Sequence, residues 1–197
     1  MGRNKTYDRE DVTRKAMELF WARGFEATST KDLANHMGVN VYSLFAEFKS
    51  KQGLYEAALA LYSKEVVARN FHALEGPDAG LDDIAAVFEF FAANADGPIA
   101  SRGCLLCNAA TERAASDAAS QEFVATHFQS IENGVRNALT NASARGELRA
   151  DVSCVDHGKF LTATLAGIFV LMRAGLGTEF LVAAARAARR EIERIRA

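Results

Sequence analysis

The chain has 197 residues, of which 49% are hydrophobic and 24% are charged, and its formal net charge is −2. This length is enough for one or two domains with a proper core, and the near-neutral balance excludes a global basic field that attracts nucleic acid by charge alone. The charge is uneven, because residues 1–55 hold nine Lys and Arg against seven Asp and Glu, a net of +2 that leaves −4 for the remainder. The first part of the chain therefore has a mild electrostatic footprint for nucleic acid.

Composition also predicts the class of protein. Only two prolines, with abundant Ala, Leu, Glu and Arg, favour a mostly helical chain. The polar N-terminus lacks the apolar run of a signal peptide, and the most apolar segment, residues 160–172, is shorter than the roughly 20 residues that cross a bilayer. Three cysteines favour free thiols in a reducing compartment over a disulfide framework. We expect a soluble cytoplasmic protein with no membrane partner, no cofactor and no resident metal.

The first predicted helix covers about residues 9–23. Asp8, with Asp11, supplies its N-terminal cap. Its buried stripe has helical spacing and consists of Val12, Ala16, Leu19 and Phe20. Trp21 lies off this stripe, and we expect it to be partly buried. The helix braces the segment that follows.

Residues 28–55 predict two short helices joined by a tight turn. Ser29 and Asp32 form a capping box at the start of the first helix, with the Asp carboxylate in place of the usual Glu. Gly38 ends that helix, because glycine adopts the left-handed turn without steric cost, and Asn40 caps the second. The inward apolar residues are Leu33, Ala34 and Met37 in the first helix and Leu44 and Phe48 in the second. This pattern is typical of a helix-turn-helix, whose second helix lies in the major groove.

This stretch resembles the TetR family of transcriptional regulators. The matching residues are Leu19, Phe20, Gly24, Phe25, Ala34, Gly38, Val39, Leu44, Phe48, Ser50, Lys51 and Leu54. The resemblance covers roughly residues 8–55 in detail, and the rest of the chain only in length and helical layout. It implies an all-α fold of about nine helices, with an N-terminal three-helix helix-turn-helix domain in residues 1–55 and a helical effector-binding and dimerisation domain in residues 56–197. It also implies a double-stranded DNA operator as partner.

The expected DNA-binding surface is poor in the Arg, Asn and Gln side chains that make bidentate contacts to bases. Its residues are Thr30, Lys31, Asn40, Val41, Tyr42, Ser43, Phe45, Ala46, Glu47, Lys49 and Lys51. TetR relatives often carry Tyr-His where this chain has Phe45-Ala46, so the tyrosine hydroxyl that commonly contacts a phosphate is missing at position 45. Tyr42 is expected to supply such a hydroxyl instead. Reading of the sequence would then depend on apolar contacts with thymine methyl groups, on Tyr42 and on Ser43.

Several charged residues of this region have two interpretations. Glu47 either accepts a hydrogen bond from a cytosine amine, or repels phosphate and only caps the helix or pairs with Lys51. Lys49 and Lys51 either anchor phosphate near the N-terminus of the next helix or are solvated surface charges. Arg3 and Lys5 belong either to a disordered tail or to a basic arm that touches phosphate or a minor groove.

The next predicted helix, about residues 51–71, begins in the DNA-binding part and ends in the following domain. Its apolar residues keep helical spacing across the junction: Leu54, Ala58, Leu61, Tyr62 and Val66. Because no flexible linker intervenes, motion of the C-terminal domain must move the recognition helix. This continuity is a physical basis for a ligand switch.

Further helices are predicted at about residues 81–94, from 103 to 114, and from 117 to 145. Their aromatic residues are first of all core, although a cavity between bundle helices is mostly apolar with a few polar anchors. The expected effector pocket, bound by an unidentified small molecule, consists of Phe88, Phe91, Cys104, Cys107, Phe123, His127 and Phe128.

Cys104 and Cys107 are the sharpest chemical feature outside the helix-turn-helix. If a helix starts near Gly103, both thiols lie in its first turn, where the helix dipole lowers a thiol pKa. The pair then has three interpretations: apolar filling of a helix interface, a sensor of oxidants or electrophiles at Cys104, or a metal site, which usually needs four ligands. A thiol enzyme that uses Cys104 with His127 is a remote alternative, since no orienting third group is visible.

Two helices close the chain, one through residues 160–172 and one from about Glu179. The first is apolar nearly all round and needs a cover on two sides, and the second has small Ala residues along one face. Together they predict half of a four-helix interface in a homodimer, made by Phe160, Thr164, Gly167, Leu171, Phe180, Ala184, Ala188 and Ile192. Arg186, Arg189 and Arg190 are expected on a solvated face.

The sequence thus predicts a homodimeric, non-enzymatic regulator that represses transcription and leaves a palindromic operator when a small molecule binds. The alternative keeps the DNA-binding role and makes oxidation or alkylation of Cys104 the signal.

Overall fold

The computed structural model describes residues 7–97 and 100–197, so the expected basic arm at Arg3 and Lys5 lies outside the described residues. Within these ranges the chain is helical, with one isolated β-bridge between Leu148 and Arg196. The main helices are α1 (Arg9–Arg23), α2 (Thr30–Met37), α3 (Val41–Phe48), α4 (Lys51–Tyr62), α6 (Leu81–Ala93), α7 (Leu105–Glu112), α8 (Ala118–Ala144), α9 (Cys154–Ala174) and α10 (Thr178–Arg194). The predicted all-α class is confirmed. Short helical segments, α5 (Ala68–Phe71), His72–Glu75 and Ala100–Arg102, connect them.

The local signals of the helix-turn-helix act as the sequence predicts. Ser29 and Asp32 form the reciprocal capping box at the start of α2. Gly38 ends that helix in the left-handed region at φ 68°, and the Asn40 side chain accepts a hydrogen bond from the Tyr42 amide at the start of α3. These caps satisfy amides that a short helix otherwise leaves without partners.

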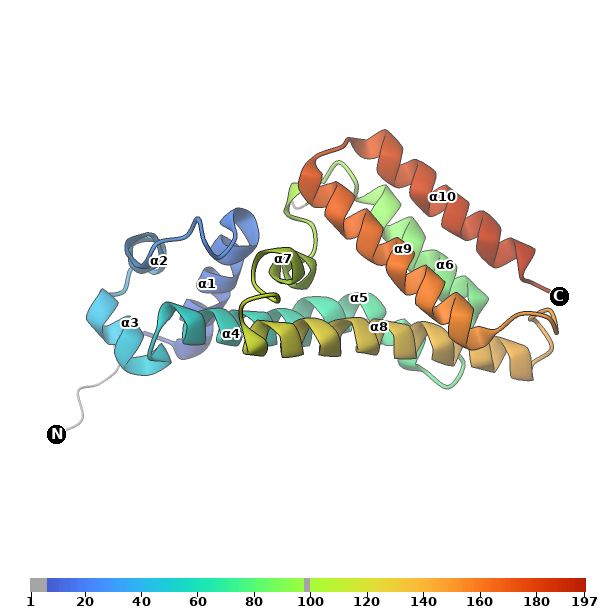
Figure 1. Cartoon of the computed structure of the whole chain (residues 1–197), viewed down its shortest axis with the longest axis horizontal. Coiled ribbons are helices and arrows are strands. Elements are labelled where there is room, and N and C mark those ends of the chain that lie inside the picture. Colours follow the sequence, from blue (N-terminus) through green and yellow to red (C-terminus); the bar gives the residue numbers. More distant parts are fainter. Residues whose placement is uncertain (1–6, 98–99) are drawn as a thin grey trace.

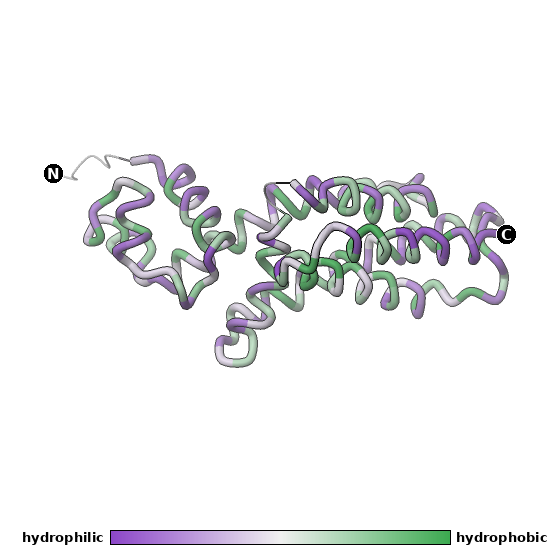
Figure 2. Tube along the Cα trace, turned by 90° about the horizontal axis from the view of Figure 1, so that it is seen from above, coloured by the Kyte–Doolittle hydropathy of each residue, from purple (hydrophilic) through white to green (hydrophobic). Residues whose placement is uncertain are grey.

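Figure 1 shows α1, α2 and α3 grouped at the N-terminal end of the molecule, and α6, α9 and α10 stacked above α8 at the other end. The small domain has an aromatic core, in which Phe20 and Tyr55 meet edge to face at 5.0 Å and Phe25 lies 4.9 Å from Tyr55. In the larger domain α6 packs on α10, and α8 packs on α9. Hydrophobic and hydrophilic residues alternate along these helices (Figure 2), as amphipathic helices require.

The single helix expected over residues 51–71 is interrupted. α4 ends at Tyr62, a π-helical turn follows at Ser63–Val67, and α5 continues to Phe71. The Ser63 hydroxyl donates to the Leu59 carbonyl at 3.1 Å, and such a side-chain bond competes with the backbone ladder. The backbone nevertheless stays helical, so the two domains share a continuous rod.

Of the final pair of helices, α9 is longer than expected, whereas α10 begins at Thr178, beside the expected Glu179. α9 has 21 residues instead of the 13 of its apolar centre, and by length and composition it is the helix of the described ranges that could cross a membrane. The same test is passed by the core helix of a soluble protein. α9 packs against α7, α8 and α10 and has Asp156 in its first turn.

Candidate DNA-binding surface and effector pocket

The recognition helix α3 exposes three of its predicted outer residues, Val41, Tyr42 and Ala46. Tyr42 is 90% exposed and Val41 38% exposed, whereas Leu44 and Phe48 are buried in the domain core. Ala46 is exposed, and Ser43 and Phe45 are half-buried. Tyr7 donates from its hydroxyl to the Ser43 carbonyl at 3.0 Å, which ties the start of the described chain to α3. The buried face of α3 is thus packed on the domain, and its exposed residues Val41, Tyr42 and Ala46 are uncharged.

Glu47 has a partner that the sequence interpretation missed. Its carboxylate lies 3.0 Å from Arg9 Nε of α1, rather than in the expected pair with Lys51. The Arg9 guanidinium also lies 5.1 Å from the centre of the Phe48 ring. The ion pair links the recognition helix to α1 and neutralises the Glu47 carboxylate, which would otherwise repel a phosphate.

The two lysines after α3 differ in environment. Lys49 is exposed and has φ 68°, the positive-φ residue other than glycine in the described chain. The Ser50 amide donates to the Phe48 carbonyl at 2.8 Å, so Lys49 is the centre of a strained γ-turn. Lys51 is half-buried with Nζ 4.1 Å from the centre of the Phe25 ring, and burial lowers its pKa. Lys49 therefore faces outward, while Lys51 belongs partly to the domain junction.

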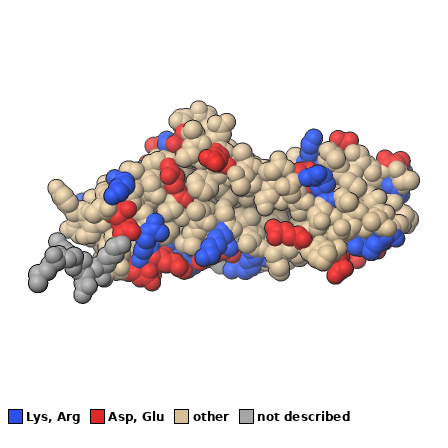
Figure 3. Space-filling view, turned by 90° about the horizontal axis from the view of Figure 1, so that it is seen from below, with Lys and Arg blue, Asp and Glu red and all other residues tan. Residues whose placement is uncertain are grey.

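The other expected DNA contacts lie on the same end of the molecule. Thr30 and Lys31 occupy the first turn of α2 and are exposed, as is Asn40. Figure 3 shows Lys and Arg interspersed with Asp and Glu on the face seen from below, so that face has no extended patch of one sign. Affinity for phosphate would come from a few placed groups rather than from a broad field.

We expect Lys49→Ala to weaken operator binding severalfold and to reduce the slope of log affinity against log salt by about one, because one phosphate contact is lost. Lys49→Gly should cause the same loss while raising the free energy of unfolding by about 1 kcal/mol, since glycine relieves the positive φ. Binding titrations at several salt concentrations and urea unfolding measure both effects.

Lys64→Ala is the matched control, because Lys64 is an exposed lysine outside the helix-turn-helix. An unchanged salt slope in Lys49→Ala would remove Lys49 from the DNA contacts.

The N-terminal domain is bound to the larger domain through the turn after α1. The Phe25 amide donates to Glu112 Oε2 at 2.9 Å, and Arg113 pairs with Glu26 at 3.1 Å. The Arg113 guanidinium also lies 4.5 Å from the centre of the Phe25 ring. This ring therefore contacts two cations, Arg113 after α7 and Lys51 of α4. The end of α7 is therefore fixed to the end of α1.

A second link joins the start of α7 to α1. Trp21 Nε1 donates to the Gly103 carbonyl at 2.9 Å inside the protein, and Trp21 stacks edge to face on Tyr62 at 5.1 Å. Arg173 of α9 donates to the carbonyls of Trp21 and Ala22 at 3.3 and 3.1 Å. Trp21 is 8% exposed, more deeply buried than its position off the apolar stripe predicts.

These links border a small, mostly enclosed cavity of about 80 Å³. Its walls come from α1, the α4–α5 rod, α6, α8 and α9; the lining residues are Trp21, Tyr62, Val66, Val67, Arg69, Asn70, Phe71, Phe90, Phe91, Asn94, Gly103, Cys104, His127, Phe169 and Met172. We call it the junction pocket. It is predominantly aromatic and aliphatic, as small-molecule sites usually are.

Three of the expected pocket residues line the junction pocket: Phe91, Cys104 and His127. The others expected there, Phe88, Cys107, Phe123 and Phe128, are not among its lining residues; Phe88 and Cys107 are buried and the other two partly buried against the core. Trp21, Tyr62 and Phe169 were missed, because helical periodicity gives the buried face of a helix but not which distant helix it meets.

The structure brings Cys104 and His127 together. Cys104 Sγ lies 3.5 Å from His127 Nε2, and both side chains are 4% exposed. Burial disfavours the Cys104 thiolate, but hydrogen bonds from Cys107 and His127 outweigh burial and hold the pKa of Cys104 well below its usual value. The hydrogen bond to Cys104 and burial raise the pKa of Cys107. Cys104 is therefore the more acidic thiol of the pair.

The position of the thiols differs slightly from expectation. α7 begins at Leu105, so Cys104 is its N-cap residue and only Cys107 lies in its first turn. His127 Nδ1 is buried without a hydrogen-bond partner among the described residues, so no orienting group completes a nucleophile–base set there. Over the same ranges, no three His, Cys, Asp or Glu side chains gather as metal ligands.

The residues expected at a dimer interface divide into two sets. Phe160 and Phe180 are 52% and 59% exposed, and Gly167 is exposed, whereas Thr164, Leu171 and Ala184 are half-buried. Ala188 and Ile192 instead pack inside the protomer core, because α10 turns that face toward α6. Val155, Val170 and Leu176 add to the exposed apolar residues of this surface.

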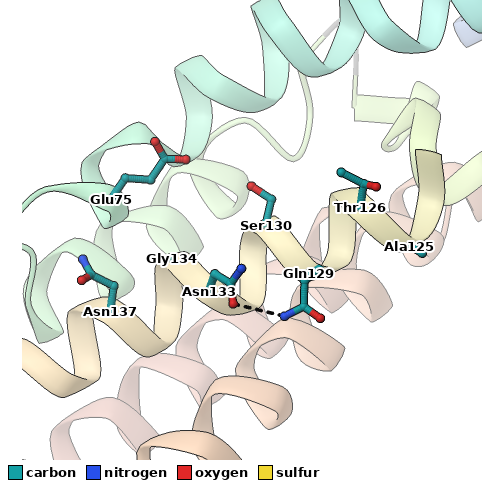
Figure 4. A pocket seen from close by; sticks show the side chains of 8 residues that line it. All are labelled: Glu75, Ala125, Thr126, Gln129, Ser130, Asn133, Gly134 and Asn137. Carbon is teal, nitrogen blue, oxygen red and sulfur yellow. Dashed lines mark hydrogen bonds between the residues drawn. The ribbon is translucent and has the colours of Figure 1, made fainter. Parts of the chain in front are cut away.

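A second, wide and open cleft of about 720 Å³ runs along α8 (Figure 4). Its polar side chains already serve the fold: Asn137 Nδ2 donates to the carbonyls of Leu74 and Gly76, and Gln129 donates to Asn133 Oδ1. It lacks the enclosed apolar walls of the junction pocket.

A capped helix-turn-helix, joined by a continuous rod to a helical domain with an internal pocket, defines a DNA-binding transcriptional regulator. Residues 12–58 match the bacterial regulatory proteins of the tetR family, and residues 80–188 match the tetracyclin repressor-like C-terminal domain. The chain belongs to the TetR family of transcriptional regulators.

Known relatives are similar to this chain over nearly its whole length. The chain is 29% identical to the HTH-type transcriptional repressor ComR of Escherichia coli (strain K12) over 184 residues, which are 92% of this chain and 87% of that protein. A cysteine variant of the TetR family regulator CifR, solved with 26-base-pair operator DNA, superposes with a TM-score of 0.82 at 27% identity over 96% of this chain and 98% of that one. A TetR regulator from Chloroflexus aurantiacus J-10-FL gives a TM-score of 0.83 at 25% identity, covering 95% of each chain. These relatives are regulators rather than enzymes.

Proposed function

We propose that this protein is a cytoplasmic repressor that binds a palindromic operator as a homodimer and leaves it when a small molecule occupies the junction pocket. Residues 1–55 would bind DNA, and residues 56–197 would bind the effector and dimerise. The observation that carries the proposal is Trp21, which belongs to α1 of the DNA-binding domain and yet lines the pocket. A molecule in that cavity would contact the DNA-binding domain directly.

The rod gives a second path for the signal. Tyr62 at the end of α4, and Val66 and Phe71 in the segment that continues it, line the same pocket. α4 begins two residues after the recognition helix. Expansion of the cavity would displace this segment and with it α3, because packed elements shift as units rather than deform continuously. Two recognition helices set at a fixed spacing would then lose register with the operator.

Dimerisation through α9 and α10 is supported by their exposed apolar side chains. Large exposed apolar side chains on two neighbouring helices are typical of an interaction site, and a twofold arrangement would use the same surface of each copy. Such a dimer would place its recognition helices about 34 Å apart, one turn of DNA. ComR is named a repressor, which supports repression over activation.

The second candidate keeps the operator binding and replaces the reversible ligand by covalent modification of Cys104. The observation in its favour is the thiol–imidazole contact of 3.5 Å inside the junction pocket. A small oxidant or electrophile that enters the pocket would meet the more acidic thiol of the chain's buried pair.

Binding of the purified protein to the DNA that flanks its own gene tests the proposal. We expect a specific complex of one dimer per site, competed by the same DNA and not by an unrelated duplex of equal length. Loss of the complex on oxidation and its return with a thiol reductant would favour the second candidate, whereas indifference to oxidant would favour the reversible ligand. A protein that binds no duplex specifically, including sites selected from a random library, would contradict the proposed function.

A further inference from the structure

We propose that Cys104 and Cys107 form a peroxide-responsive dithiol whose disulfide is read out by α1 through Gly103 and Trp21. The proposal rests on the second candidate function and adds the class of the signal, the resolving thiol and the path to the DNA-binding domain. It differs from simple modification of Cys104 because both thiols are required and because the oxidised form can be reduced again.

The two thiols lie close together at the start of α7. Cys104 is the N-cap of α7, and Cys107 is the third residue of that helix. Residues three apart at a helix start have β-carbons about 5–6 Å apart, whereas a disulfide needs about 3.5–4.5 Å. The bond is thus within reach, but only if the N-cap moves toward the helix. Formation of the disulfide must displace the chain at Gly103 and Cys104.

The environment of Cys104 favours its reaction with a small oxidant. Cys104 lines the junction pocket, and its contacts with His127 Nε2 and Cys107 lower its pKa, so it is the more acidic thiol of the pair. The cavity of about 80 Å³ is smaller than the ~150 Å³ apolar cavity that admits benzene. Hydrogen peroxide or a short alkyl hydroperoxide fits, and both are uncharged, as the aromatic walls require.

The chemistry balances with the groups present. The Cys104 thiolate attacks one peroxide oxygen, so an S–O bond forms and the O–O bond breaks; the leaving oxygen takes up a proton and departs as water or an alcohol. The product is a sulfenic acid on Cys104. The Cys107 sulfur then attacks the Cys104 sulfur, the S–S bond forms, and the S–O bond breaks to release water. Two thiols are oxidised, and one peroxide is reduced.

The residue before Cys104 is connected to α1 by a hydrogen bond. Gly103 precedes Cys104 and accepts the indole hydrogen bond of Trp21 at 2.9 Å. Gly103 has φ 62°, and a β-carbon there would lie 2.7 Å from the Phe169 carbonyl, so this point of the chain has no free space in which to absorb a shift. Movement of Cys104 therefore moves the acceptor of Trp21. Because Trp21 also lines the pocket and packs on Tyr62, α1 and the rod would shift together.

The test uses the full-length protein and hydrogen peroxide as the probe. We expect a mass decrease of two hydrogens, loss of two free thiols, a change in the fluorescence of the single tryptophan, and operator affinity lowered about tenfold or more, within the usual range of coupling between sites. A thiol reductant should reverse all four changes. Cys107→Ser should stop at the sulfenic acid, captured as a dimedone adduct, and Cys104→Ser should not react.

Two variants separate the parts of the proposal. Cys154→Ser, which removes the third and only partly buried cysteine, should behave as the wild type. Trp21→Phe keeps the ring and loses the N–H donor, so it should form the disulfide with a much smaller change in operator affinity; circular dichroism confirms that it folds.

An unchanged mass, a disulfide that includes Cys154, or a disulfide without effect on operator binding would each overturn the proposal. Failure of the proposed function is distinguishable, because the mass and dimedone readouts do not require DNA, and absence of operator binding by the reduced protein would be seen before any oxidant is added.

Discussion

Replacement of Gly103 by alanine is expected to lower the free energy of unfolding by about 2–5 kcal/mol, because a side chain at positive φ costs about 1–2 kcal/mol and overpacking typically adds about 1–3 kcal/mol. The new methyl group would lie 2.7 Å from the Phe169 carbonyl and 3.1 Å from Arg173 Cβ. The first of these atoms is backbone in the middle of α9 and cannot yield cheaply. Urea unfolding, followed by circular dichroism, measures the loss.

The same substitution should also disturb the DNA-binding domain, since Gly103 is the acceptor of Trp21. We expect a shifted emission spectrum from Trp21 in the folded variant. Gly146→Ala is the matched control: Gly146 has φ 74° but nothing within 4 Å of the added carbon, so only the conformational cost of about 1–2 kcal/mol applies. Equal losses in the two variants would show that close packing at Gly103 contributes nothing.

The double substitution Phe160→Asp and Phe180→Asp is expected to convert the protein to a folded monomer and to weaken operator binding by about 10²–10⁴, because the two half-sites would no longer be bound as one unit. Both side chains are more than half exposed in the protomer, so their loss removes little of its own core, while four buried charges would oppose the dimer. Analytical ultracentrifugation and binding titrations measure the two effects.

Ala125→Asp adds one carboxylate at an exposed position of α8 that lines the open cleft, outside α9 and α10, and should leave the dimer intact. A double variant that remains dimeric with unchanged operator affinity would mean that another surface joins the two copies.

Local signals made the small domain predictable from the sequence. The capping box at Ser29, the left-handed Gly38 and the Asn40 cap each depend on residues within four positions, so they could be identified without knowledge of the rest of the chain. The apolar spacing of α1 likewise gave the face that contains Phe20. These features depend on residues that are close in sequence, so the sequence alone predicts them.

The contacts between distant elements were not predictable in the same way. Glu47 lies beside Arg9 rather than Lys51, since a helix pattern does not say which neighbour is nearer in space. The partial burial expected for Trp21 became nearly complete burial because Gly103 and Arg173, far along the chain, come to meet it. For the junction pocket, the residue type at Cys104 and His127 gave a signal, but Tyr62 and Phe169 carried none that distinguishes a cavity wall from ordinary core.

The π-helical turn at Ser63–Val67 has a geometric consequence for the whole molecule. Before it, Tyr55 of α4 packs on Phe20 and Phe25 of the small domain, and beyond it Phe71 lies beside Phe91 of the larger one. A wider turn holds more residues than an α-helical turn, so it changes the azimuth of the apolar stripe without ending the rod. One continuous helical segment can then pack on both domains, and a rotation at one end is transmitted to the other without a hinge.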